Sequence, residues 1–177
     1  EYFDKILFIN RDERPDRLEH AHAEFDRLGI KNYERVSGFT VCEPGYNTPN
    51  GHFGCTAAHR LALDLVCHFR WKRTLIFEDD FKARYDDVEQ RFKDMTGSIP
   101  EWDMLYLGGH YGAAPASRIN EHVIKPTSML TTSSYAVTRD LARIMAPYIH
   151  SGHQIDGLLS GFIVKCRAYI IQPRLFG

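Results

Sequence analysis

The stretch TLIFEDDF, residues 74–81, joins a short segment typical of a buried β-strand to three adjacent carboxylates, Glu78, Asp79 and Asp80. Three neighbouring negative charges repel one another unless a cation compensates for them. In α/β proteins, ligands bind outside the carboxyl ends of the strands. We therefore expect this strand to end at a ligand-binding site.

Segments on both sides of this strand alternate between strand and helix patterns. Residues 5–9 and 33–38 have strand patterns, and between them lies a helical pattern that Pro15 would begin and Gly29 would follow. Residues 42–54 fit neither pattern and predict a loop. The next helix is expected over residues 58–69 with Thr56 as N-cap. The order strand–helix–strand predicts an α/β fold with a mostly parallel central sheet flanked by helices.

Weaker patterns continue to the end of the chain. A short helix is predicted around residues 88–95, an irregular segment over 109–128, and a helix capped by Thr138. Strands are predicted over residues 103–109, 133–137 and 167–173, and a short helix over 155–162. The loops at the carboxyl ends of the strands should carry the function.

Composition excludes several classes of protein. The net charge of −1 offers no electrostatic basis for binding nucleic acid or an anionic membrane, so we expect no nucleic-acid partner. No run approaches the ~18 apolar residues of a membrane span. The cysteines Cys42, Cys55, Cys67 and Cys166 are interpreted as buried thiols of a reducing compartment, with a Cys42–Cys55 disulfide as the alternative. We expect a cytoplasmic protein, with peripheral membrane attachment left open.

The acidic strand end predicts a divalent cation that arrives with a diphosphate. Mn²⁺ or Mg²⁺ prefers oxygen ligands and commonly takes one or two carboxylates plus substrate phosphates. Asp80 is the first choice for metal coordination, and Glu78 for the metal or the nucleotide ribose, because alternate residues of an extended chain share a face. Asp79 then points the other way, toward a salt bridge or the edge of the nucleotide site. The alternative is an acidic loop paired with nearby basic residues, Lys72, Arg73, Lys82 and Arg84.

Polar residues after the first strand are candidates for the nucleotide site. Asn10, Arg14 and Arg17 follow that strand, and the guanidinium fork suits a diphosphate. A solvated helix face with internally paired charges is the alternative. Gly38, at the end of the second strand, is assigned to the same site. His59 is expected in the first turn of its helix, where it could donate to a phosphate or to uridine, or could be structural.

The remaining aromatic and histidine residues that stand out in the sequence are assigned to the acceptor site, to packing or to the surface. His110 and Tyr111 follow a strand end and are assigned to the acceptor or the sugar. Trp71 and Trp102 are interpreted as packing residues. His20 and His22 are two residues apart on a predicted helix, a spacing that does not direct both side chains to one metal. Both are therefore assigned to the surface.

Seven segments, taken in order, resemble glycosyltransferase family 25, which includes lipooligosaccharide and procollagen galactosyltransferases. They are FINRDERPDRLE, GHFGCTAAHRLAL, LIFEDDF, WDMLYLGG, SSYAVTRDLARIM, HQIDGLLS and IIQPRLF. The sequence departs from the family pattern at Ala58 and Thr138, where serine is usual, and at Arg11, where leucine is preferred. It also stops directly after QPRLFG, so a ligand from a downstream tail would be missing from view.

The resemblance implies one GT-A-type glycosyltransferase domain over residues 1–177. It implies a UDP-sugar donor carrying galactose or glucose, a divalent metal, and inverting transfer of the hexose to a hydroxyl of a glycan or glycoprotein. Asp156 matches the family's D-x-x-L position, and inverting transfer needs a carboxylate that accepts the acceptor's proton. Asp156 is therefore the candidate catalytic base. Its alternative role is to cap a helix over residues 157–162.

Two other functions remain open. A nucleotidyltransferase also sets a carboxylate-bound metal at a strand end, but it should carry a glycine-rich phosphate loop after its first strand. Here that position reads NRDERPDR, with no glycine before Gly29. A non-catalytic GT-A-fold binding module is the other alternative, against which the acidic triad and Asp156 argue.

Overall fold

The computed structural model describes residues 2–38, 51–111, 116–149 and 153–177. The helices are α1 (Pro15–Arg27), α2 (Gly51–Phe69), α3 (Val88–Thr96), α4 (Arg139–Met145), the 3-10 helix η1 (Ala146–Tyr148) and α5 (Ile155–Ile163). The strands are β1 (Lys5–Arg11), β2 (Tyr33–Gly38), β3 (Arg73–Glu78), β4 (Met104–Tyr106), β5 (Ala116–Arg118), β6 (Val123–Pro126), β7 (Ser134–Thr138) and β8 (Ala168–Ile171).

The strands form one sheet in the order β2-β1-β3-β7-β4-β8-β6-β5. The half that contains β2, β1 and β3 is parallel, as the strand–helix–strand pattern predicts. The sheet as a whole is mixed rather than mostly parallel, because β7 runs antiparallel to both β3 and β4 and β6 runs antiparallel to β8. Since β7 is antiparallel to both neighbours, β3 and β4 point the same way, and their carboxyl ends lie at one edge.

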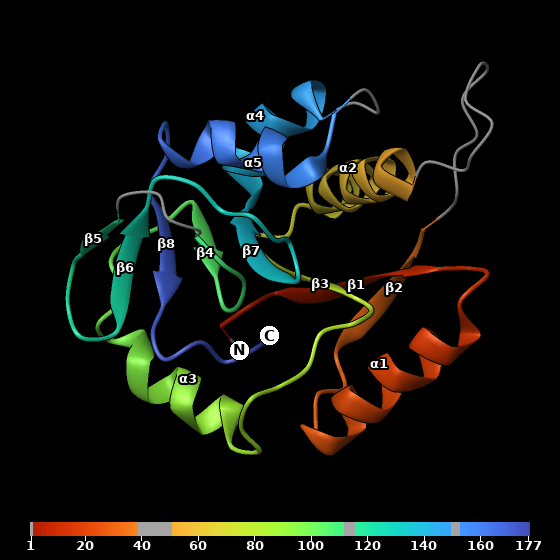
Figure 1. The fold of residues 1–177 in the computed structure, drawn as a ribbon, viewed down its shortest axis with the longest axis horizontal. Coiled ribbons are helices and arrows are strands. Elements are labelled where there is room, and N and C mark those ends of the chain that lie inside the picture. The colour runs from red at the N-terminus through yellow and green to blue at the C-terminus, as the bar shows by residue number, and fades with distance from the viewer. Residues whose placement is uncertain (1, 39–50, 112–115, 150–152) are drawn as a thin grey trace.

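Helices cover both faces of the sheet. In Figure 1, α2, α4 and α5 lie above the sheet and α1 and α3 lie below it. Alternation along β1 decides which residues face which layer: Leu7 and Ile9 pack with the α2 side, whereas Phe8 packs with the α1 side. Each layer therefore buries its own hydrophobic core against the central sheet.

Helix α1 has the predicted ends, whereas helix α2 begins earlier in the sequence than predicted. Helix α1 begins at Pro15, and Gly29 follows it with a φ of 69°, as predicted. Helix α2 begins at Gly51, so residues 51–54 are helical instead of forming a loop. Thr56 is consequently inside the helix, and its hydroxyl donates to the His153 carbonyl instead of capping. His59 lies beyond the first turn for the same reason, so the expected placement at the helix N-terminus is wrong.

One segment of the second half of the chain contains strands that were not predicted. The segment 109–128, predicted to be irregular, contains the antiparallel pair β5 and β6 at the sheet edge. Thr138 caps α4 as predicted, accepting a hydrogen bond from the Leu141 N–H at 3.4 Å. Among the described helices, none has both the length and the apolar character needed to cross a bilayer.

Candidate active site

A cavity of about 470 Å³ opens where β3 and β4 end and β7 begins. The start of α5, Cys55 of α2, Arg84 and Gly177 also line it. Its lining residues are Cys55, Glu78, Asp80, Arg84, Gly109, His110, Leu130, Thr131, Thr132, Ser133, Gln154, Ile155, Asp156 and Gly177. Glu78 and Asp80 thus line the same cavity as Asp156, which is distant from them in the sequence.

Glu78 is held by three side chains at the cavity wall. Its Oε1 accepts hydrogen bonds from His59 Nε2 at 3.1 Å, from the Thr132 hydroxyl, and from Cys55 Sγ at 3.9 Å. Burial alone would raise the pKa of Glu78, but the hydrogen bonds from His59 and Thr132 and the positive charge of Arg17 hold it below its ordinary value. Glu78 is therefore an anion at neutral pH.

His59 connects this anion to the core of the protein. Its side chain is fully buried, and its Nδ1 lies 3.0 Å from the hydroxyl of Tyr135, which is buried on β7. Because the Glu78 carboxylate can only accept, His59 Nε2 carries a proton, and in the neutral ring Nδ1 accepts from the Tyr135 O–H. Burial raises the pKa of Tyr135 well above its usual value, so this hydroxyl stays protonated.

This arrangement predicts opposite outcomes for two buried tyrosines. Tyr135→Phe leaves His59 Nδ1 buried without a partner and should lower the free energy of unfolding by about 1–3 kcal/mol. Tyr106 is also fully buried, but among the described residues its hydroxyl has no hydrogen-bond partner. Tyr106→Phe should therefore leave stability unchanged or raise it. Urea unfolding of both variants measures the difference, and equal losses would contradict this assignment of the network.

Asp79 turns away from the cavity, as strand alternation predicts. Its carboxylate is 6% exposed and accepts from Asn10 Nδ2 at 2.8 Å and from Arg17 Nη1 at 2.9 Å. Asn10 is fully engaged, since its Nδ2 also donates to the Arg14 carbonyl and its Oδ1 accepts from Arg35 Nε. This cluster ties β1 and α1 to the end of β3 and gives the acidic turn its rigidity.

The cationic partner of the acidic turn is Arg17, which also contacts Asp80 at 3.1 Å. The alternative partners near the strand, such as Lys72 and Arg73, form no ion pairs with Asp79 or Asp80 among the described residues. Arg14, the N-cap residue of α1, pairs with Asp16 in the first turn of that helix. Six residues that were assigned to the nucleotide site do not line the cavity: Asn10, Arg14, Arg17, Gly38, His59 and Asp79. Their assignment to the nucleotide site stays a prediction.

Asp80 fits the role of a hard-metal ligand better than Asp79 does. Its side chain is 51% exposed, and it lines the cavity beside Glu78. Carboxylate oxygens are the ligands that Mn²⁺ and Mg²⁺ prefer. The residues present at this edge therefore suit the predicted cation, with Asp80 and Glu78 as the ligands that would hold it.

Asp156 lies in the first turn of α5 and lines the same cavity as Glu78 and Asp80. The helix begins at Ile155 and its N-cap residue is Gln154, so Asp156 is not the cap residue and the alternative role assigned to it is wrong in detail. Its Oδ1 accepts from the Gly157 N–H at 3.1 Å, which orients the carboxylate at a half-buried position. A carboxylate held there can accept a proton from a ligand in the cavity.

Several cavity residues were not singled out by sequence patterns. Thr132 belongs to a segment without a regular pattern, and no signal in the sequence would have selected it. Arg84 was named only as a possible salt-bridge partner of the acidic loop. Cys55 was interpreted as a buried thiol, or alternatively as the disulfide partner of Cys42, although its spacing of four from His59 on a helix signals that the two share a face. Burial, followed by the charge of Glu78, raises the pKa of Cys55 to about 12.

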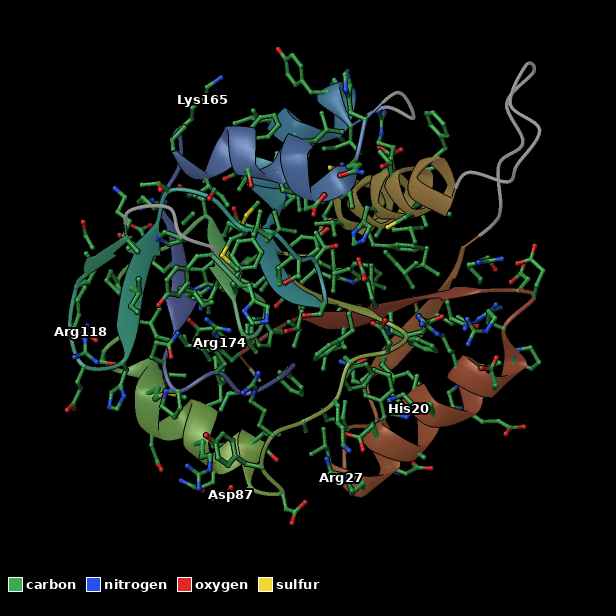
Figure 2. The ribbon with its side chains drawn as sticks, viewed as in Figure 1. His20, Arg27, Asp87, Arg118, Lys165 and Arg174 are labelled. Carbon is green, nitrogen blue, oxygen red and sulfur yellow. The ribbon has the colours of Figure 1, made fainter. Side chains whose placement is uncertain are left out.

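His110 and Tyr111, assigned to the acceptor or the sugar, and His20, assigned to the surface, make the following contacts; the assignment of His110 and Tyr111 stays a prediction. His110 lines the cavity, and its Nδ1 lies 3.0 Å from Arg174 Nη1, whose guanidinium also lies over the Tyr111 ring. Figure 2 shows His20 on the side of α1 that faces the chain after β3, where His20 Nε2 contacts the Phe81 carbonyl at 2.9 Å.

The two tryptophans have packing roles, and the described cysteines are free thiols. Trp102 is buried and Trp71 stacks on Phe69, which confirms their packing roles. The thiols of Cys55, Cys67 and Cys166 are free and half-buried, whereas Cys42 lies outside the described residues.

No family model matches the chain. A human protein named inactive glycosyltransferase 25 family member 3 is 27% identical over 129 residues, covering 60% of this chain and 22% of that protein. A Drosophila melanogaster protein named glycosyltransferase 25 family member is 26% identical over 127 residues, covering 59% of this chain and 21% of that protein. The chain resembles glycosyltransferase family 25.

The family 25 resemblance that the motifs predicted is thus confirmed by curated relatives. The chain spans about a fifth of the length of these relatives. One of them carries the word inactive in its name, so similarity alone does not decide whether a family 25 relative is catalytic.

Solved structures agree with the fold implied by family 25. A structure described as mannose-1-phosphate geranyltransferase from Thermus thermophilus superposes with a TM-score of 0.54 at 10% identity, covering 98% of this chain and 75% of that chain. The glycosyltransferase GlyE of Streptococcus pneumoniae superposes with a TM-score of 0.51 at 9% identity, covering 95% of this chain and 45% of that chain. At such low identity these likenesses show the fold, which is GT-A-like α/β.

Proposed function

We propose that this chain is the catalytic domain of a metal-dependent glycosyltransferase that moves a hexose from a UDP-sugar to an acceptor hydroxyl. The observation that carries the proposal is the cavity at the carboxyl ends of β3 and β4, where Glu78, Asp80 and Asp156 meet. Resemblance to family 25 supports the choice of a UDP-galactose or UDP-glucose donor and of inverting transfer. A hydroxyl of a glycan or glycoprotein is the proposed acceptor.

The residues that line the cavity have different proposed tasks. Asp80 and Glu78 would hold Mn²⁺ or Mg²⁺, which when bound neutralises charge on the leaving diphosphate. Arg84 and His110 line the same cavity and add positive or hydrogen-bonding groups to it. Asp156, on the α5 wall, would accept the proton of the attacking hydroxyl at its carboxylate. The rigid Asp79–Asn10–Arg17 cluster would keep the acidic turn in place behind this site.

Nucleotide-sugar hydrolysis tests the donor and the metal together. With a panel of nucleotide sugars and no acceptor, we expect slow hydrolysis of a UDP-hexose that requires Mn²⁺ and stops in EDTA. Asp80→Asn should weaken UDP binding in Mn²⁺ by about tenfold or more, or about 1.4 kcal/mol, because it removes an anionic metal ligand. Calorimetry with and without EDTA makes the measurement.

The matched control is Asp94→Asn, which removes an exposed carboxylate on α3 that contacts Gln90. This variant should bind UDP like the wild type. UDP affinity that is the same with and without EDTA would contradict the proposed metal role. Formation of a nucleotide sugar and pyrophosphate from a nucleoside triphosphate and a sugar 1-phosphate would instead favour the nucleotidyltransferase alternative. No turnover with any donor would favour a binding module.

A further inference from the structure

We propose that Cys55, His59 and Glu78 form a binding site for a borderline-soft divalent cation of the Zn²⁺ class in the cavity wall. This site differs from the hard-metal site of the proposed function, in which Asp80 is the leading ligand. It does not rest on that function, because the three side chains would bind the cation in the absence of any nucleotide sugar.

The three ligand atoms already lie close to the positions that zinc requires. They are all within 4.8 Å of one another, with 3.1 Å between His59 Nε2 and Glu78 Oε1 and 3.9 Å between Cys55 Sγ and the same oxygen. Zinc bonds of about 2.0–2.1 Å to nitrogen or oxygen and about 2.3 Å to sulfur place tetrahedral ligand atoms about 3.3–3.6 Å apart. The two measured separations bracket this range, so small side-chain adjustments would complete the site.

Regular elements hold the ligands in this arrangement. Cys55 and His59 are four residues apart on α2, a spacing that places both side chains on one face of the helix. Glu78 is the last residue of β3 and approaches the same face from the sheet. Because the ligands come from one helix and one strand end, the site is built before any ion arrives, which lowers the ordering cost of binding.

Tyr135 supplies the outer partner that a metal-bound histidine needs. Histidines that bind metals donate their other ring N–H to a neighbouring acceptor, which fixes the tautomer and the ring orientation. The Tyr135 hydroxyl lies 3.0 Å from His59 Nδ1 and can accept as well as donate. His59 can therefore move its proton from Nε2 to Nδ1, keep its hydrogen bond to Tyr135, and present a lone pair to the cation.

The donor set selects the class of ion. Thiolate and imidazole ligands favour Zn²⁺ over Mg²⁺ or Mn²⁺, which prefer oxygen. Cys55 and Glu78 line the cavity, so the fourth coordination position would face its interior, as in zinc sites that keep one position open. Since Glu78 belongs to both proposed sites, bound Zn²⁺ would compete with Mn²⁺ for that carboxylate.

Cobalt titration of the full chain tests the site directly. Co²⁺ is added to EDTA-stripped protein without nucleotide, and we expect a single equivalent to produce the near-ultraviolet charge-transfer band of a Co²⁺–thiolate bond. Zn²⁺ should abolish this band by displacement. In Cys55→Ser the band should disappear and the Zn²⁺ affinity measured by calorimetry should fall more than about 100-fold, since loss of outer-shell partners alone costs about 10–100-fold.

The matched control is Cys67→Ser, which changes another half-buried thiol of the same helix and should keep the band and the affinity. No band in the wild type, a band that survives in Cys55→Ser, or a band lost in Cys67→Ser would each overturn the proposal. If Cys55→Ser does not fold, Glu78→Gln takes its place, and an unchanged Zn²⁺ affinity in that folded variant is the contradicting result. Failure of the hydrolysis assay would leave these measurements unaffected, so the two proposals fail separately.

Discussion

Asp156→Asn is expected to lower the rate of sugar transfer by about 10²–10⁴-fold, the usual contribution of a positioned acid–base group. The amide is nearly isosteric with the carboxylate and can still accept the Gly157 N–H, but it cannot take the proton of the acceptor hydroxyl. Because the helix begins at Ile155 and Gln154 is its N-cap, the substitution removes no cap. Melting temperature and UDP affinity should therefore stay at wild-type values.

The transfer rate, the UDP affinity and the melting temperature are measured on the same preparation of the variant and compared with those of the wild type. Asp140→Asn is the matched control, because Asp140 is also an acidic residue in the first turn of a helix, α4, but it is exposed and does not line the cavity. A transfer rate unchanged in Asp156→Asn would remove this residue from the mechanism. A loss of UDP affinity in step with the rate would instead place Asp156 in the donor site.

Gly108→Ala is expected to destabilise the protein by about 1–3 kcal/mol, the typical cost of inserting a methyl group into a well-packed core. A Cβ at this position would lie 2.6 Å from the Ser134 Oγ and 2.7 Å from the Phe176 carbonyl oxygen. The Phe176 backbone is held by Leu107, and its ring packs against Phe77, so the C-terminal segment cannot yield without breaking these contacts.

The same substitution should also weaken UDP binding, because the displaced segment ends at Gly177, which lines the cavity. Gly161→Ala is the matched control, since a Cβ at Gly161 on α5 would meet nothing within 4 Å. In the interior of a helix that change should stabilise by about 0.5–1 kcal/mol. Chemical denaturation of both variants checks the opposite signs, and two changes of the same sign would contradict the packing described for the end of β4.

Local patterns predicted the individual elements well where one physical signal dominated. The apolar run before Asn10 and the run before Glu78 are strands, and the helix between Pro15 and Gly29 has the ends that its terminal residues indicated. Helix α2 extends further toward its N-terminus than predicted because tertiary contacts, such as that between Thr56 and His153, stabilise a start that Gly51 and Gly54 do not signal. The β5–β6 pair escaped prediction because edge strands need no continuous apolar pattern.

The sequence by itself determined the α/β class, the resemblance to family 25, and the location of an acidic strand end, because periodicity and short motifs are properties of neighbouring residues. It also determined that Asp79 and Glu78 face opposite ways, because side chains alternate along an extended chain.

Only the tertiary structure decided which of these residues meet. It brought Asp156 to the cavity that Glu78 and Asp80 line, turned Arg17 and Asn10 into supports for Asp79, and brought Cys55 and His59 to Glu78. These contacts depend on the strand order. The direct pairing of β1 with β3 brings Asn10 close to Asp79, and β7 inserted antiparallel between β3 and β4 puts the carboxyl ends of these two strands at one edge. Strand order is the outcome of packing between distant segments, so local patterns do not determine it.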